Sequence, residues 1–122
     1  MLDRFAFWQY RDDNNCWDYV REFLIEKAGI PADHVPKFGI APKDKRSMHK
    51  AGRQVAASFK SSDPTDFAVA CHYRGGVLFH VGIVHNGRVR HTGEKIGTRN
   101  DTIEDFESMA DTVYMLHKSL WQ

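Results

Sequence analysis

Two short stretches of the chain hold side chains whose types and spacing suit thiol chemistry. In the first, "NNCWDYVREFL", Cys16 follows small polar residues and opens an amphipathic segment. A thiol at the start of a helix lies at the positive end of the helix dipole, which favours its nucleophilic thiolate form. The first backbone N–H groups of a helix have no partner within the helix, so they are candidate donors to an oxyanion. Cys16 is therefore a candidate nucleophile.

The second stretch, "HVGIVHNGRVRH", contains an Asn-Gly pair that predicts a two-residue hairpin turn. Counting back from this turn pairs Gly82 with His91, and residues two apart on one strand share a face. His80 and His91 are therefore expected to be diagonal neighbours on one face, with no side chain at Gly82 between them. One imidazole would act as the base for Cys16 and the other would hold its tautomer. His85 falls on the opposite face and is expected to take no part.

The positions of these residues depend on one helix and a group of strands. Apolar residues at helical spacing predict a helix from Cys16 to Ala28, with a polar cap at 12–15 and a stop at Gly29. The same spacing predicts a second helix over 43–60, with a basic outer face. A short helix or turn is expected at 102–110, and strands are expected over 67–73, 77–85, 88–92 and 112–118. Helices followed by an antiparallel meander define an α+β fold.

Length and composition are those of one globular domain over 1–122. The chain has 122 residues, of which 42% are hydrophobic and 27% charged, and a formal net charge of +1, which argues against nucleic-acid binding through overall charge. No apolar run is long enough to span a bilayer, so no membrane partner is expected. The N-terminus lacks a signal-peptide pattern. We therefore expect synthesis in the cytoplasm, with any action at the cell wall or periplasm depending on another carrier.

The same residues allow other interpretations. Cys16, His80 and His91 form an alternative zinc set, although no carboxylate or further cysteine stands at a ligand spacing. Cys71 lies in an apolar strand, where a cysteine is usually a small buried hydrophobe, and a Cys16–Cys71 bridge under oxidising conditions is the alternative. The basic face of 43–60 is either a solvated surface or a patch for an anionic partner.

At the two stretches the chain resembles the NlpC/P60 peptidoglycan hydrolases, a family of papain-like cysteine peptidases and amidases. The family pattern is a cysteine that opens a helix, a strand with His-Val-Gly-Ile, and a third polar residue further along. The matching stretches are "NCWDYVREFL" and "HVGIVHNGRVRH", and the Cys-Trp form is most similar to the phage tail-associated type. The likeness covers most of the chain apart from 31–65.

The resemblance implies a papain-like fold in which the N-terminal cysteine helix packs on an antiparallel sheet. It implies Cys16 as the nucleophile, His80 as the general base and His91 as the third residue of a triad. Tyr10 is the candidate for a further oxyanion donor, and Trp17, beside the nucleophile, is a candidate for lining a substrate groove. No metal or organic cofactor is implied.

The expected function is hydrolysis of peptide or amide bonds in peptidoglycan stem peptides, with phage tail or secretion-apparatus proteins as candidate partners. Two positions depart from the family pattern: Asn15 stands where Asp is usual, and Asp18 stands where Gly is usual. A carboxylate near Cys16 opposes thiolate formation. The alternatives are a non-catalytic tail or wall-binding module of the same fold, and an intracellular thiol deamidase, transacylase or protease that uses the same three residues.

Overall fold

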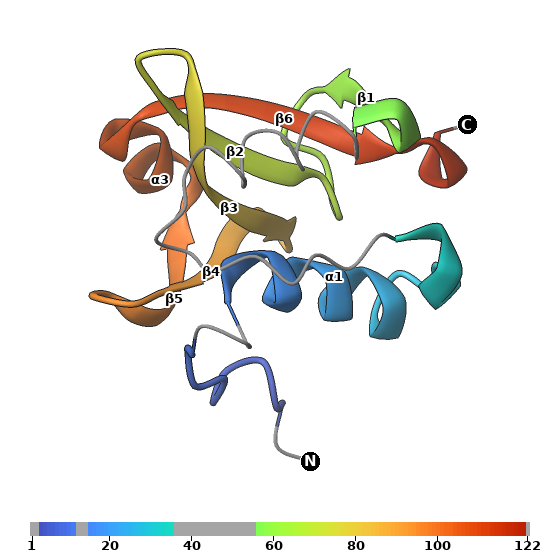
Figure 1. The fold of residues 1–122 in the computed structure, drawn as a ribbon, viewed down its shortest axis with the longest axis horizontal. Coiled ribbons are helices and arrows are strands. Elements are labelled where there is room, and N and C mark those ends of the chain that lie inside the picture. The colour runs from blue at the N-terminus through green and yellow to red at the C-terminus, as the bar shows by residue number, and fades with distance from the viewer. Residues whose placement is uncertain (1–2, 12–14, 36–55, 122) are drawn as a thin grey trace.

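One helix packed on one antiparallel sheet forms the frame of the protein (Figure 1). The computed structural model describes residues 3–11, 15–35 and 56–121. Helix α1 (Cys16–Glu26) packs on one face of the sheet, chiefly against strands β3 and β4, and the short helix α3 (Ile103–Met109) packs on the other. No helix in the described part of the chain has the length and apolar character that a membrane span needs. The expected α+β class, with the cysteine helix on an antiparallel sheet, is therefore confirmed.

The sheet has six strands in the order β1-β6-β2-β3-β4-β5, and all neighbouring pairs are antiparallel. The strands are β1 (Phe59–Ser62), β2 (Val69–Arg74), β3 (Val77–His85), β4 (Arg88–Gly93), β5 (Gly97–Thr102) and β6 (Asp111–His117). Single turns of 3-10 helix are found at η1 (Ala32–His34), η2 (Ala56–Ser58) and η3 (Lys118–Leu120). Strands β2, β3 and β4 form the expected meander, and β5 extends it. The last strand departs from it, because β6 turns back and pairs between β1 and β2.

Strands β1 and β5 are not predicted by the sequence, and β1 corrects the helix expected over 43–60. Most of that helix, with its basic face, lies outside the described residues. The last two residues of the range belong to β1, where Phe59 pairs with His117 and Lys60 with Leu116. Phe59 is buried and Lys60 is exposed, an alternation that suits an edge strand. Strand β5 is not predicted because its sequence, "GTRNDT", lacks the apolar residues that would alternate with polar ones in a recognisable strand.

The apolar side chains of the sheet divide between two clusters, one on each face. The cluster on the α1 side contains Val69, Cys71, Val81 and Ile83, together with residues of α1. The cluster on the α3 side contains Ala68, Ala70, Val84, Val89 and Phe106. Because successive residues of a strand point to opposite faces, this division also fixes the face on which each neighbouring histidine lies.

Candidate active site

The β3–β4 hairpin has the register that its Asn-Gly turn predicts. Gly82 pairs with His91. Asn86 and Gly87 have φ values of 53° and 75°, the left-handed backbone of a type I′ turn. The Asp66 carboxylate accepts the Asn86 N–H at 3.0 Å and so holds the turn from outside. The turn and the register therefore fix which face of the sheet each side chain of the hairpin occupies.

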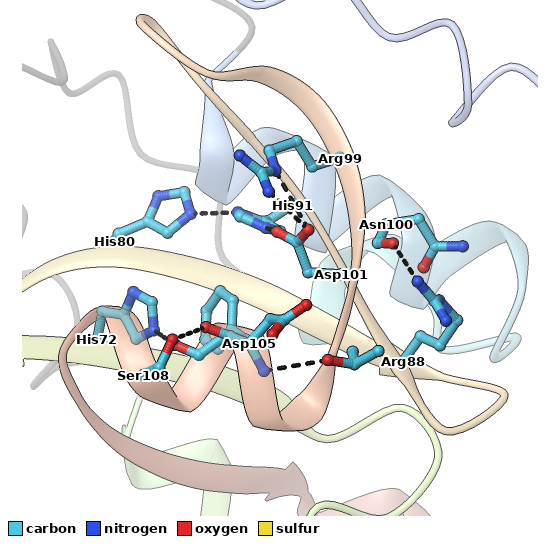
Figure 2. A network of polar contacts seen from close by, with 11 residues as sticks. His72, His80, Arg88, His91, Arg99, Asn100, Asp101, Asp105 and Ser108 are labelled. Carbon is cyan, nitrogen blue, oxygen red and sulfur yellow. Dashed lines mark hydrogen bonds and ion pairs between the residues drawn. The ribbon is translucent and has the colours of Figure 1, made fainter.

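This register brings His80 and His91 into direct contact, as the sequence predicts (Figure 2). Nε2 of His80 and Nδ1 of His91 are 2.8 Å apart, and the two ring planes are inclined by 69°. Gly82 allows the approach, because a Cβ there would lie 3.0 Å from Cβ of His91 and 2.8 Å from a methyl carbon of Val89. The histidine pair is thus built into the hairpin.

A carboxylate that the sequence does not single out extends this pair. Nε2 of His91 lies 2.7 Å from Oδ2 of Asp101 on β5. Oδ1 of Asp101 accepts hydrogen bonds from Nε and Nη2 of Arg99, at 3.2 and 2.9 Å. Because His91 pairs with Arg99 across β4 and β5, Asp101 is its diagonal neighbour on the same face. The result is a continuous chain of polar contacts from His80 through His91 and Asp101 to Arg99 (Figure 2).

Burial and charge set the protonation states along this chain. His91 is fully buried, and burial lowers its pKa below the ordinary value of 6.5 although the Asp101 carboxylate acts to raise it. Burial acts to raise the pKa of Asp101, but hydrogen bonds from Arg99 and His91 outweigh this and hold it below 3.8. At neutral pH an ionised Asp101 therefore lies beside a neutral His91.

Cys16 is the first residue of α1 and follows an asparagine cap. The Asn15 side-chain oxygen accepts the N–H groups of Trp17 and Asp18, at 3.1 and 3.2 Å. The Asp18 carboxylate in turn accepts the N–H of Asn15 at 3.0 Å. This reciprocal capping box gives Asn15 and Asp18 a structural role. The Trp17 and Asp18 amides are therefore engaged by Asn15, which corrects the expectation that the first N–H groups of the helix lack a partner.

Cys16 and the histidine pair lie on elements that pack together. Helix α1 contacts both β3 and β4, and in Figure 2 the blue start of α1 passes behind the His80–His91 pair. Cys16 is buried, with 6% of the residue's surface exposed, in the cluster that also contains Cys71 and Val81. Val81 directly follows His80, which is half-buried and precedes the stretch over which β3 pairs with β4.

The two imidazoles lie on the α3 side of the sheet. The ring centroids of His80 and His91 are 6.1 and 4.9 Å from that of Phe106 on α3. His72 of β2 stacks on the same phenylalanine at 3.7 Å and lies 5.7 Å from His80. The structure thus brings His80 and His91 together on one face and places Cys16 in the core cluster of the other.

Of the two residues expected to line the site, Trp17 lies in α1 and Tyr10 lies in the segment that precedes it. Trp17 follows Cys16 in the helix and is half-buried against the α1-side cluster. Tyr10 is half-buried in the segment 3–11 that precedes the helix.

The remaining histidines have structural or solvated positions where they are described. His85 packs between two phenylalanines on the α1 side, opposite to the pair. His72 contacts a backbone carbonyl of α3 at 2.8 Å, and His117 contacts a serine hydroxyl at 2.8 Å. His34 is exposed, and His49 lies outside the described residues.

The zinc alternative needs three ligands around one point. Within residues 3–11, 15–35 and 56–121, no three His, Cys, Asp or Glu side chains are grouped so as to hold a metal ion. Nε2 of His80 and Nδ1 of His91 point at each other across a hydrogen bond, not toward a shared ion.

Comparison with known proteins places the chain in no family. No family model matches it, and neither does any curated protein or solved structure. A function therefore has to be argued from the residues, their geometry and the two motif stretches.

Proposed function

We propose that the protein is a papain-like cysteine hydrolase of the NlpC/P60 type that cleaves peptide or amide bonds in peptidoglycan stem peptides. The observation that carries the proposal is the 2.8 Å contact between Nε2 of His80 and Nδ1 of His91, made by two strands on which the Cys16 helix packs. Cys16 is the nucleophile, His80 the general base and His91 the residue that orients His80. The substrate class, and delivery by a phage tail or secretion apparatus, come from the resemblance of the motif stretches.

The reaction follows from the positions of the protons. With Nε2 of His80 engaged by His91, Nδ1 of His80 takes the Cys16 proton, and the thiolate attacks the substrate carbonyl carbon. The Cys16 amide, with Tyr10, holds the oxyanion. The imidazolium gives the proton to the leaving amine as the C–N bond breaks, which leaves a thioester on Cys16. Water then attacks the thioester, passes a proton through His80 to the departing sulfur, and releases the acid and the thiol.

The proposal makes one geometric demand. The Cys16 side chain packs in the α1-side cluster and the His80 ring contacts Phe106 on the α3 side. Sγ of Cys16 and Nδ1 of His80 therefore have to meet around β3 where this strand runs beyond its pairing with β4, the region in which His80 is half-buried. The positive end of the α1 dipole favours a thiolate there, whereas burial disfavours it. His80 therefore has to stabilise the Cys16 thiolate by more free energy than burial costs it.

A non-catalytic module of the same fold is the second candidate, and the burial of Cys16 favours it. With 6% of its surface exposed and its side chain in the α1-side cluster, Cys16 resembles a small core hydrophobe. In that case the histidine pair stabilises the sheet, and the protein binds wall or tail components without cleaving them.

Digestion of purified peptidoglycan tests the function. The enzyme is expected to release stem-peptide fragments with new amino ends, with no release by Cys16→Ala and at least about a 100-fold slower release by His80→Ala. His85→Ala is the matched control, because this histidine lies on the opposite face of the sheet and its loss is expected to spare activity. Binding to peptidoglycan without any release would support the non-catalytic module.

A further inference from the structure

Asp101 is held from two sides at the far end of the His80–His91 pair. Its Oδ2 lies 2.7 Å from Nε2 of His91, and its Oδ1 accepts two hydrogen bonds from Arg99. The Asp101 side chain is 11% exposed and that of His91 is 0% exposed. Asp101 thus contacts the orienting histidine, so its effect on the base is transmitted through His91.

The direction of each hydrogen bond in this chain follows from the carboxylate, because an ionised carboxylate only accepts. Nε2 of the neutral His91 therefore carries the ring proton, and Nδ1 of His91 holds a lone pair. That lone pair faces Nε2 of His80 at 2.8 Å, so Nε2 of His80 is the donor. A neutral His80 then keeps its lone pair on Nδ1, the nitrogen that the proposed mechanism uses as the base.

We propose that Asp101 is a positioning residue that sets the tautomers of His91 and His80 and leaves the basic lone pair on Nδ1 of His80. The inference rests on the proposed function for its catalytic consequence, whereas the tautomers exist whether or not Cys16 reacts. The groups that face His91 are His80 from β3, His72 from β2, Arg99 and Asp101 from β5, and Phe106 from α3. Of these groups Asp101 is the anion, and Arg99 fixes its second oxygen.

Arg99 makes the expected effect of Asp101→Asn specific. The Asn carbonyl oxygen has to take the place of Oδ1, because Arg99 only donates. The Asn amide then donates to Nε2 of His91, which moves the His91 proton to Nδ1 and reverses the hydrogen bond to His80. The proton of His80 moves to Nδ1 and blocks the base, although the shape of the substituted side chain is unchanged. In a Ser-His-Asp triad, replacing the aspartate by asparagine lowers kcat by a factor of about 10⁴.

The first test reads the tautomers directly, by nitrogen NMR of histidine-labelled protein at neutral pH. His91 is expected to be protonated at Nε2 in the wild type and at Nδ1 in Asp101→Asn, and the neutral form of His80 is expected to show the same change. Asp111→Asn, which changes an exposed acid on β6, is the matched control and is expected to keep the wild-type tautomers. A wild-type His91 protonated at Nδ1 would overturn the inference even if Asp101→Asn failed to fold. Unchanged tautomers in folded Asp101→Asn would also overturn it.

The second test separates this inference from the proposed function. Cys16 alkylation by iodoacetamide is followed against pH in the wild type, Asp101→Asn and Asp101→Glu. Asp101→Asn is expected to slow labelling near pH 7 by about tenfold, as the thiol returns to a free pKa of about 8.5, and Asp101→Glu to restore part of the rate. Slow labelling of the wild type together with the expected tautomers would contradict the proposed function and support the inference about Asp101. Equally fast labelling of all three would overturn the role of Asp101.

Discussion

Nε2 of His80 and Nδ1 of His91 are 2.8 Å apart, although the residues are separated by 11 positions and lie on different strands. The contact exists because the Asn-Gly turn fixes the register and because Gly82 leaves room between the strands. A hydrogen bond between two neutral imidazoles needs one ring to donate and the other to accept, so it has a direction. That direction is what suits the pair to orienting a base.

Gly82→Ala tests whether the hairpin builds this pair. The added Cβ would lie 2.8 Å from Cγ1 of Val89 and 3.0 Å from both Cβ of His91 and the Arg90 carbonyl oxygen, so β3 and β4 have to move apart. We expect a loss of about 1–3 kcal/mol in the free energy of unfolding, measured with urea. Val113→Ala, at an exposed position of β6, is the control and is expected to stay within about 0.5 kcal/mol of the wild type. Wild-type stability in Gly82→Ala would contradict the tight approach.

The hairpin could be derived from the sequence because its information is local. An Asn-Gly turn sets the register, and strand alternation then places His80 and His91 on one face and His85 on the other. The cysteine helix was equally readable, from its polar cap and its apolar spacing. Its end shifts only from Ala28 to Glu26.

Asp101 could not be derived in the same way. Strand β5 is wholly polar, so periodicity does not reveal it, and without β5 the acid has no register against His91. The turn between Gly93 and Gly97, directly after a predicted strand, was the signal that a further strand follows. Strand β1 was not predicted for another reason, because its pairing with β6 joins segments that are distant in the chain.

The free energy of unfolding is expected to fall as the pH drops below 6.5. Burial lowers the pKa of His72 and of His91 below that value. The unfolded chain therefore takes up protons first, and stability that is fully present above pH 6.5 is lost as the pH falls toward the folded pKa values. Each histidine contributes at most about 1.4 kcal/mol per pH unit. Urea titrations across this range measure the slope, and His72→Gln is expected to reduce it; an identical slope in that variant would count against the assignment.

Asn15→Ala is expected to destabilise the protein by about 1 kcal/mol. The change removes the acceptor of the Trp17 and Asp18 amides at a buried helix start. Urea unfolding measures the loss, with Asn100→Ala on the exposed side of β5 as the matched control. If the two variants are equally stable, the capping box does not contribute as the geometry indicates.

Cys71 is expected to resist alkylation in the folded protein. It is buried, and burial together with the nearby Cys16 raises the pKa of its thiol to about 12. At pH 9 only about one molecule in a thousand would carry the thiolate. Peptide mapping after labelling, with and without urea, measures this, and both cysteines are free thiols in the structure. Equal labelling of Cys71 with and without urea would show that the alkylating reagent reaches the α1-side core of the folded protein.

The most direct test of the central claim is the rate at which iodoacetamide alkylates Cys16 in the folded protein between about pH 5 and about pH 9. A poised nucleophile is expected to label with an apparent pKa well below the free value of about 8.5, and His80→Ala is expected to abolish that shift. His85→Ala, on the opposite face of the sheet, is the matched control. A Cys16 that labels no faster than a free thiol, or as slowly as Cys71, would contradict the catalytic proposal and favour a non-catalytic module.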